Sequence, residues 1–97
     1  MKLAWQISEE NGTKTAYIDL REISVKIVNY IDYIEGPIPD RYQYHIYAFG
    51  ALRECEGCPE EYKTIEQACE YVERQVVDFI KGEMIRWRHH LYDWEGK

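Results

Sequence analysis

Cys55-Glu56-Gly57-Cys58-Pro59 is the sharpest local motif in the sequence, because two cysteines at C-x2-C spacing form half of a zinc knuckle. A metal site needs four converging ligands, and Cys69 with a histidine would complete the set: His45, His89 or His90. A second C-x2-C or H-x3-H pair is missing. Cys69 also falls on an apolar helix face, where a buried thiol acts as a small hydrophobe. We therefore expect no bound metal and no cofactor.

His89 and His90 are neighbours near the end of an expected helix. Successive residues point about 100° apart on a helix, so the two rings do not chelate one metal from the same face. Their charge complements the negative end of the helix dipole instead. A cysteine–histidine nucleophile is conceivable, but the sequence places no cysteine beside a histidine. Without an anchored acid, base and nucleophile, we do not expect an enzyme.

Cations and aromatics alternate from Arg86 to Tyr92, a mixture typical of proteins that bind single-stranded nucleic acid. Tyrosines on a sheet would extend such a stacking platform: Tyr30, Tyr33, Tyr42, Tyr44 and Tyr47. The acidic chain lacks the usual basic footprint, and Trp87 and Leu91 also fit a core-facing helix stripe. The alternative interpretation is a small nucleic-acid-binding or zinc-stabilised domain. It would use Cys55, Cys58 and the cluster from Arg86 to His90.

Acidic residues dominate the middle of the chain. From residue 54 to 79 there are eight acidic and two basic residues, which accounts for the whole net charge of −6. Glu66, Glu70 and Glu73 share one helix face, at i, i+4 and i+7. The preceding polar segment adds Glu54, Glu56, Glu60 and Glu61. Charge of one sign can steer binding to a basic partner, although a solvated helix face explains the same pattern. These seven glutamates are the predicted partner-binding residues.

Length and composition indicate the number of domains and the class of protein. A chain of 97 residues, 45% hydrophobic and 31% charged, is expected to form a single α+β domain over residues 1–97. Its first residues do not read as a signal peptide, and no stretch approaches the ~18 apolar residues of a membrane span. Three cysteines cannot all pair within one chain, so reduced thiols and a cytoplasmic location are expected.

The first half of the chain reads as strands. Alternation predicts a strand over residues 3–8, an Asn11-Gly12 hairpin turn, and a second strand over Thr13–Leu20. Residues 23–34 are ambiguous: apolar residues fall at helical spacing, but β-branched and aromatic residues favour a strand. Residues 36–40, with Pro37 and Pro39, are expected to turn. Residues 42–52 then form the clearest strand, with alternating residues on two faces.

A helix is predicted in the second half. Residues 54–63 read as a polar loop, and Thr64 with Gln67 forms a capping box at the helix start. An apolar stripe follows at 3–4 spacing: Ala68, Cys69, Val72, Val76, Phe79 and Ile80. Gly82 kinks the helix or divides it in two, and the stripe resumes at Met84, Trp87, Leu91 and Trp94. The expected fold is an antiparallel meander of about four strands with this long C-terminal helix on one face.

Binding is therefore favoured over catalysis. The preferred hypothesis is a non-catalytic module, an inhibitor or adaptor, that docks its acidic helix and loop on a basic protein, such as one that binds nucleic acid. In size, acidity and sheet-plus-helix pattern the chain resembles small phage-encoded proteins, including some anti-CRISPR and other anti-defence inhibitors. No motif carries that resemblance, so it transfers no residue role. No membrane partner is expected, and direct nucleic-acid binding is disfavoured. The sequence does not decide between a monomer and a homodimer.

Overall fold

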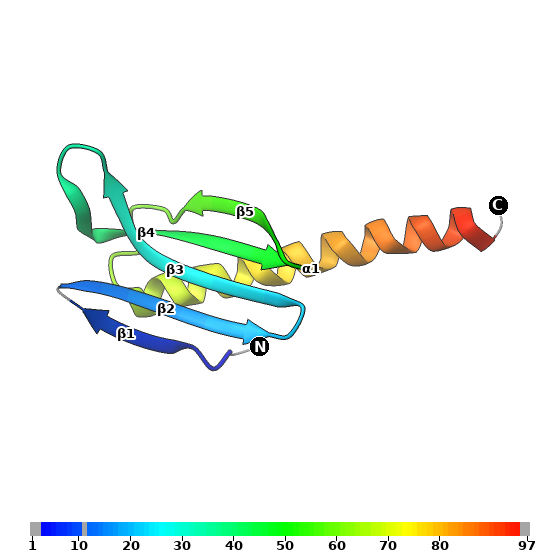
Figure 1. Ribbon diagram of the computed structural model, residues 1–97, viewed down its shortest axis with the longest axis horizontal. Helices are drawn as coiled ribbons and strands as arrows, with labels where there is room; N and C mark the ends of the chain where they lie inside the picture. Colours follow the sequence, from blue (N-terminus) through cyan, green and yellow to red (C-terminus); the bar gives the residue numbers. More distant parts are fainter. Residues whose placement is uncertain (1–2, 11, 96–97) are drawn as a thin grey trace.

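Five antiparallel strands and one helix make up the computed structural model, which describes residues 3–10 and 12–95 (Figure 1). The strands follow one another as neighbours in the order β1-β2-β3-β4-β5. Their bounds are β1 Gln6–Glu10, β2 Thr13–Leu20, β3 Ile23–Asp32, β4 Gly36–Ala48 and β5 Ala51–Gly57, and α1 spans Ile65–Glu95. The predicted α+β meander with a C-terminal helix is confirmed. It has five strands where we expected about four.

The ambiguous segment is a strand. β3 pairs with β2 and β4 along most of its length, and its alternate residues Val25 and Ile27 are completely buried. The bounds predicted for the second strand, Thr13–Leu20, agree with β2. Of the expected hairpin before it, Gly12 has a positive φ of 78°, while Asn11 lies outside the described residues.

The predicted turn at residues 36–40 is wrong, because these residues open β4. Pro37 pairs with Ile31, beyond the point at Gln43 where β5 begins to pair with β4. A proline is tolerated there because that edge of β4 has no neighbour to receive an N–H bond. Buried Asn29 secures the bulge beside it. Its Nδ2 donates to the carbonyl oxygens of Ile38 at 3.1 Å and Pro39 at 3.2 Å.

The prediction of a loop over residues 54–63 is wrong for residues 54–57, because these belong to β5. The strand predicted over 42–52 is in fact β4 and the start of β5, joined by a turn at Phe49 and Gly50. Both turn residues have positive φ, 53° and 79°, as a two-residue hairpin requires. Phenylalanine is an unusual residue at such a position, so the sequence pattern hid the turn.

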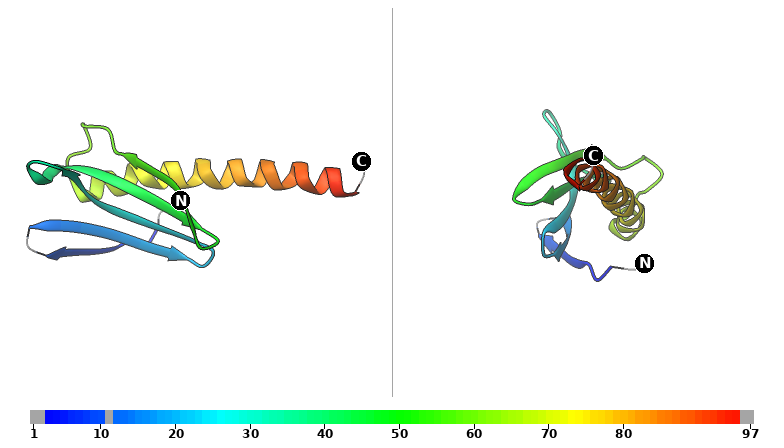
Figure 2. Two further views of the ribbon diagram at one scale, coloured as in Figure 1. Left: turned by 45° about the horizontal axis from the view of Figure 1, so that its top comes forward. Right: turned by 90° about the vertical axis from the view of Figure 1, so that its right-hand side faces the viewer.

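The core lies between one face of the sheet and the first half of α1. Figure 2 shows the helix on one side of the sheet, and it packs across β2, β3 and β4. The stripe predicted for the helix is confirmed as far as Ile80: Ala68, Cys69, Val72 and Val76 are buried, and Phe79 and Ile80 are partly buried against them. The sheet contributes alternate residues to the same core: Ala16, Ile18, Val25, Ile27, Tyr42, Tyr44 and Ile46.

The capping box at the start of α1 is confirmed. The backbone N–H of Gln67 donates to Thr64 Oγ1 at 3.1 Å, and Gln67 Oε1 accepts from the Thr64 N–H at 3.2 Å. Replacing Thr64 by alanine is expected to lower the free energy of unfolding by about 1 kcal/mol, because an N–H in the first turn loses its acceptor. Urea denaturation measures this. Thr64→Ser, which keeps the hydroxyl, is the control, and an equal loss in both variants would contradict the capping role.

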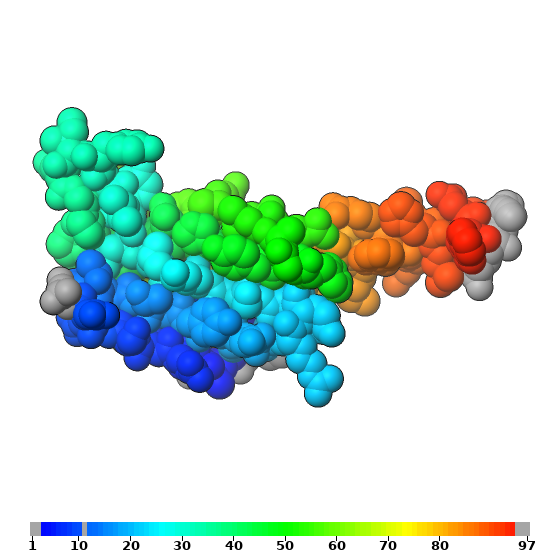
Figure 3. All heavy atoms as spheres, in the orientation of Figure 1, coloured from blue at the N-terminus to red at the C-terminus, as the bar shows by residue number. Residues whose placement is uncertain are grey.

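α1 runs past the end of the sheet. It is one helix through Gly82, so of the two predicted alternatives the division into two helices is wrong, and Figure 1 shows no sharp bend. The last ion pair to the sheet joins Glu83 Oε2 to Arg53 Nη2 at 3.7 Å. Beyond it, residues 84–94, here called the overhang, are all exposed (Figure 3). The prediction that Trp87 and Leu91 pack in the core is therefore wrong, because the apolar stripe of α1 continues beyond the end of the sheet that covers its first half.

Candidate functional site

Glu66 and Glu70, here called the acidic flank, are exposed on the covered half of α1. Neither side chain forms an ion pair or a hydrogen bond among the described residues. Glu61, in the loop before the helix, is exposed in the same way. These three carboxylates are the part of the predicted site that the fold leaves free for a partner.

Arg74 is the cation that helix spacing places one turn after Glu70, but it turns away from that carboxylate. Its Nη2 donates to the Tyr62 hydroxyl at 2.8 Å. The guanidinium also lies over the rings of Tyr62 and Tyr71, 6.0 Å and 5.9 Å from their centroids. Tyr62 and Tyr71 themselves pack at 5.0 Å between centroids. Arg74 thus fixes the β5–α1 loop to the helix and leaves Glu70 without an ionic partner among residues 3–10 and 12–95.

Glu73 has a structural task. Its Oε2 accepts a bond from the backbone N–H of Leu3 at 3.0 Å and another from Trp5 Nε1 at 2.9 Å. Both partners precede β1, so this carboxylate attaches the N-terminal segment to the helix. Glu73 is half-buried. It shares a helix side with the acidic flank, as predicted, but its charge is already satisfied within the chain.

Glu54 and Glu56 lie at the other edge of the sheet, on β5. They pair in register with Ile46 and Tyr44, whose side chains face the helix. The Tyr44 hydroxyl donates to Glu56 Oε2 at 3.3 Å. Partial burial, and then the charge of Glu56, raise the pKa of Glu54. Glu54 lines a hollow between β5 and α1 together with Arg53, Asp78, Glu83 and Arg86.

The predicted acidic site is therefore not one surface. Glu73 reaches toward the β1 side of the molecule, whereas Glu54 and Glu56 occupy the β5 edge at the opposite end of the strand order. Glu60 is paired with Arg41 at 3.2 Å, an exposed contact worth about 0–1 kcal/mol. Four of the seven predicted glutamates have no partner among the described side chains. Glu54 is half-buried on β5, so the exposed ones are Glu61, Glu66 and Glu70.

The C-x2-C motif is divided between surface and core. Cys55 is exposed, while Cys58 and Cys69 are buried and free. Burial raises the pKa of Cys58 to about 11 and that of Cys69 to about 12, so both remain protonated at neutral pH. A metal requires thiolates. Within residues 3–10 and 12–95, no three His, Cys, Asp or Glu side chains gather as ligands.

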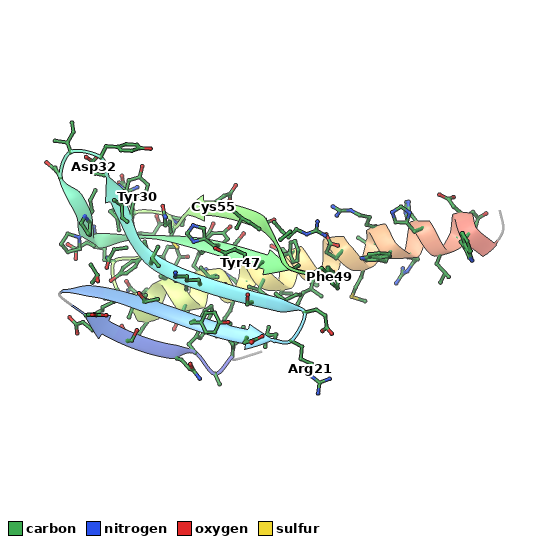
Figure 4. All side chains as sticks on the ribbon, viewed as in Figure 1. Arg21, Tyr30, Asp32, Tyr47, Phe49 and Cys55 are labelled. Carbon is green, nitrogen blue, oxygen red and sulfur yellow. The ribbon has the colours of Figure 1, made fainter. Side chains whose placement is uncertain are left out.

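The sheet register does place a histidine beside a cysteine, which sequence reasoning missed. Cys55 on β5 is the direct cross-strand neighbour of His45 on β4, and Figure 4 shows Cys55 and Tyr47 on these adjacent strands. Burial, and then Lys26, lower the pKa of His45. His45 Nδ1 has no hydrogen-bond partner among the described residues, so no acceptor or donor there orients the ring as a base. Only a known register could have revealed this pair.

The predicted tyrosine platform does not assemble. Tyr42 and Tyr44 are buried in the core, whereas Tyr47 is on the opposite face beside His45, with ring centroids 6.3 Å apart. Tyr30 lies under the Arg41 guanidinium at 5.6 Å, and Tyr33 is fully exposed after β3. The alternation along β4 alone would have separated Tyr42 and Tyr44 from Tyr47.

The cluster from Arg86 to His90 lies on the overhang. All five of its residues are exposed. Arg86 Nη1 is bound to Glu83 Oε1 at 2.7 Å, and the Trp87 and His90 rings pack at 5.7 Å between centroids. Although α1 has 31 residues, no described part of it is apolar enough to cross a membrane.

No protein-family model matches the chain, and no curated protein or solved structure matches it either.

Proposed function

We propose that this protein is a non-catalytic binding module that docks on a basic protein through the acidic flank, Glu66 and Glu70, with Glu61 beside the helix start. The observation that carries the proposal is the orientation of Arg74, which bonds to Tyr62, so that no described side chain pairs with Glu70. Glu66 and Glu70 repel each other by about 0.2–0.5 kcal/mol at i, i+4 spacing. A partner that supplies cations would relieve this repulsion.

Charge distribution supports a basic partner. Residues 54–79 carry the entire net charge of −6, and the acidic flank is exposed within that block. A field of one sign accelerates association with an oppositely charged surface and discourages acidic competitors. Because carboxylates in a row can take the place of phosphates, the partner class is a nucleic-acid-binding protein, and the module would act as its inhibitor or adaptor.

The arrangement of reactive groups supports binding rather than catalysis. Two of the three thiols are buried and protonated. The exposed Cys55 has His45 as neighbour, but that ring lacks the third group that orients a catalytic base. The hollow between β5 and α1 is open, and its Glu83 is paired with Arg53 and Arg86.

The proposal is tested by capture from cell lysate with tagged protein at low and high salt. The test variant is Glu66→Lys/Glu70→Lys. The matched control is Glu9→Lys/Glu35→Lys, which changes the net charge equally from exposed positions outside α1. We expect the native chain and the control to hold one basic protein that salt releases, and the test variant to lose it by at least about tenfold, or 1.4 kcal/mol.

Two results would contradict this function. If both double variants lose the partner equally, net charge rather than the acidic flank controls binding. If neither loses it, and salt has no effect, the partner contacts another surface. Circular dichroism of each variant checks that the fold is intact before capture. Glu73 is left unchanged in this design because its carboxylate holds Leu3 and Trp5.

A further inference from the structure

The overhang presents a row of large apolar side chains with nothing described against them. Met84, Trp87 and Leu91 are 57%, 57% and 55% exposed, and Trp94 is 88% exposed. Figure 3 shows the segment projecting alone beyond the sheet. Soluble chains rarely leave so large a contiguous apolar surface uncovered unless it meets a partner.

The spacing of this row is that of a helix-pairing seam. Ile80, Met84, Trp87, Leu91 and Trp94 follow one another at intervals of four, three, four and three residues. A 4–3 repeat places its members along one side of the helix, where a second helix can interlock with them. The overhang extends 11 residues, about 16 Å, from Met84 to Trp94. This length is about one and a half seven-residue repeats and holds four seam positions.

We propose that the overhang pairs in antiparallel orientation with the overhang of a second copy of this chain. In that dimer Met84 of each copy packs against Trp94 of the other, and Trp87 packs against Leu91. The four side chains expose roughly 600 Å² per copy, since an aromatic side chain can bury about 150–250 Å². Complete burial of these side chains in both copies would remove at most roughly 1,200 Å² from solvent, which is the lower limit of a specific interface.

Charge favours a second copy and the antiparallel orientation. Over residues 84–95 (the overhang together with Glu95), Arg86 and Arg88 balance Asp93 and Glu95, so this part of the sequence is formally neutral in a chain of net charge −6. Two overhangs can therefore approach without repulsion. An antiparallel pair keeps the two acidic blocks, residues 54–79, at opposite ends. A parallel pair would bring both blocks, each of net charge −6, side by side.

The dimer does not depend on the acidic flank, because its contacts lie on a different part of α1. The test is sedimentation velocity over a range of protein concentrations. We compare Leu91→Glu, on the seam, with Ile85→Glu, which points about 140° away from Ile80 on the wheel. Ile85 and Leu91 are equally exposed, at 56% and 55%, and both substitutions add one negative charge. Neither should unfold the protein, because both sites are on the surface.

We expect the native mass to rise from monomer to dimer with concentration. Leu91→Glu should raise the dissociation constant at least about tenfold, and Ile85→Glu less than about threefold. A native chain that stays monomeric, or two variants that weaken association equally, would overturn the proposal and leave the overhang to a different protein or to a lipid surface.

Small-angle scattering tests the orientation. The single chain is 54 Å long, and an antiparallel pair that overlaps only along the overhangs, which are about 16 Å long at 1.5 Å per residue, would be about 90 Å long. A dimer whose longest dimension stays close to that of the monomer would overturn the antiparallel arrangement.

Discussion

Replacing Ile27 by alanine is expected to lower the free energy of unfolding by about 2–5 kcal/mol. Ile27 has no exposed surface and sits on β3, the central strand, within the cluster that faces α1. The substitution removes buried methyl groups and leaves a cavity that rigid neighbours on β2 and β4 cannot fill. For a domain of this size, whose stability is about 5–10 kcal/mol, the loss approaches the threshold of unfolding.

Ile31→Ala is the matched control. It makes the same chemical change four residues further along β3, at a side chain that is 62% exposed. We expect a shift within about 0.5 kcal/mol. Urea denaturation of both variants, followed by circular dichroism, measures the difference. Similar losses at the two positions would mean that the core is not where the structure places it.

Replacing Glu73 by alanine is expected to cost about 1.5–3 kcal/mol, because one carboxylate oxygen accepts two bonds. Without it the indole N–H of Trp5 and the backbone N–H of Leu3 lose their acceptor in a part-buried setting. The segment before β1 should then detach, and hydrogen exchange at Leu3 should become faster. Denaturation and exchange measurements together test this attachment.

Glu70→Ala, three residues earlier on α1, is the control for that experiment. Glu70 is exposed and unpaired among the described residues, so its removal should change stability by less than about 0.5 kcal/mol. If Glu70→Ala proved as costly as Glu73→Ala, the division of the acidic row into a structural and a free part would be wrong.

Local patterns predicted the elements that local energetics decide. Alternation identified β2, β-branched and aromatic residues favoured a strand at β3, and side-chain chemistry identified the Thr64 capping box that opens α1. The two misplaced segments depend on non-local pairing. Residues 36–40 form a strand because β3 continues beside them, and residues 54–57 because β4 does. Neither proline-containing nor glutamate-rich sequences form strands without such neighbours.

The candidate site shows the same limit. Helix periodicity grouped Glu66, Glu70 and Glu73 on one side of the predicted helix, and all three lie on α1. Periodicity could not indicate that Trp5, 68 residues earlier, would donate a hydrogen bond to Glu73. Nor could it indicate that Arg74 would turn to Tyr62, or that the sheet would end near Glu83 and leave Trp87 and Leu91 uncovered. Each of these depends on where distant segments meet.

Carboxyl footprinting of the captured complex tests the central claim most directly. Carbodiimide coupling labels accessible carboxylates, and mass spectrometry compares each site in the free chain and in the complex. We predict that Glu61, Glu66 and Glu70, all exposed in the free chain, lose their labelling in the complex, while Glu9 and Glu35 keep theirs. Unchanged labelling at Glu66 and Glu70 in a complex that is still bound would contradict docking through the acidic flank.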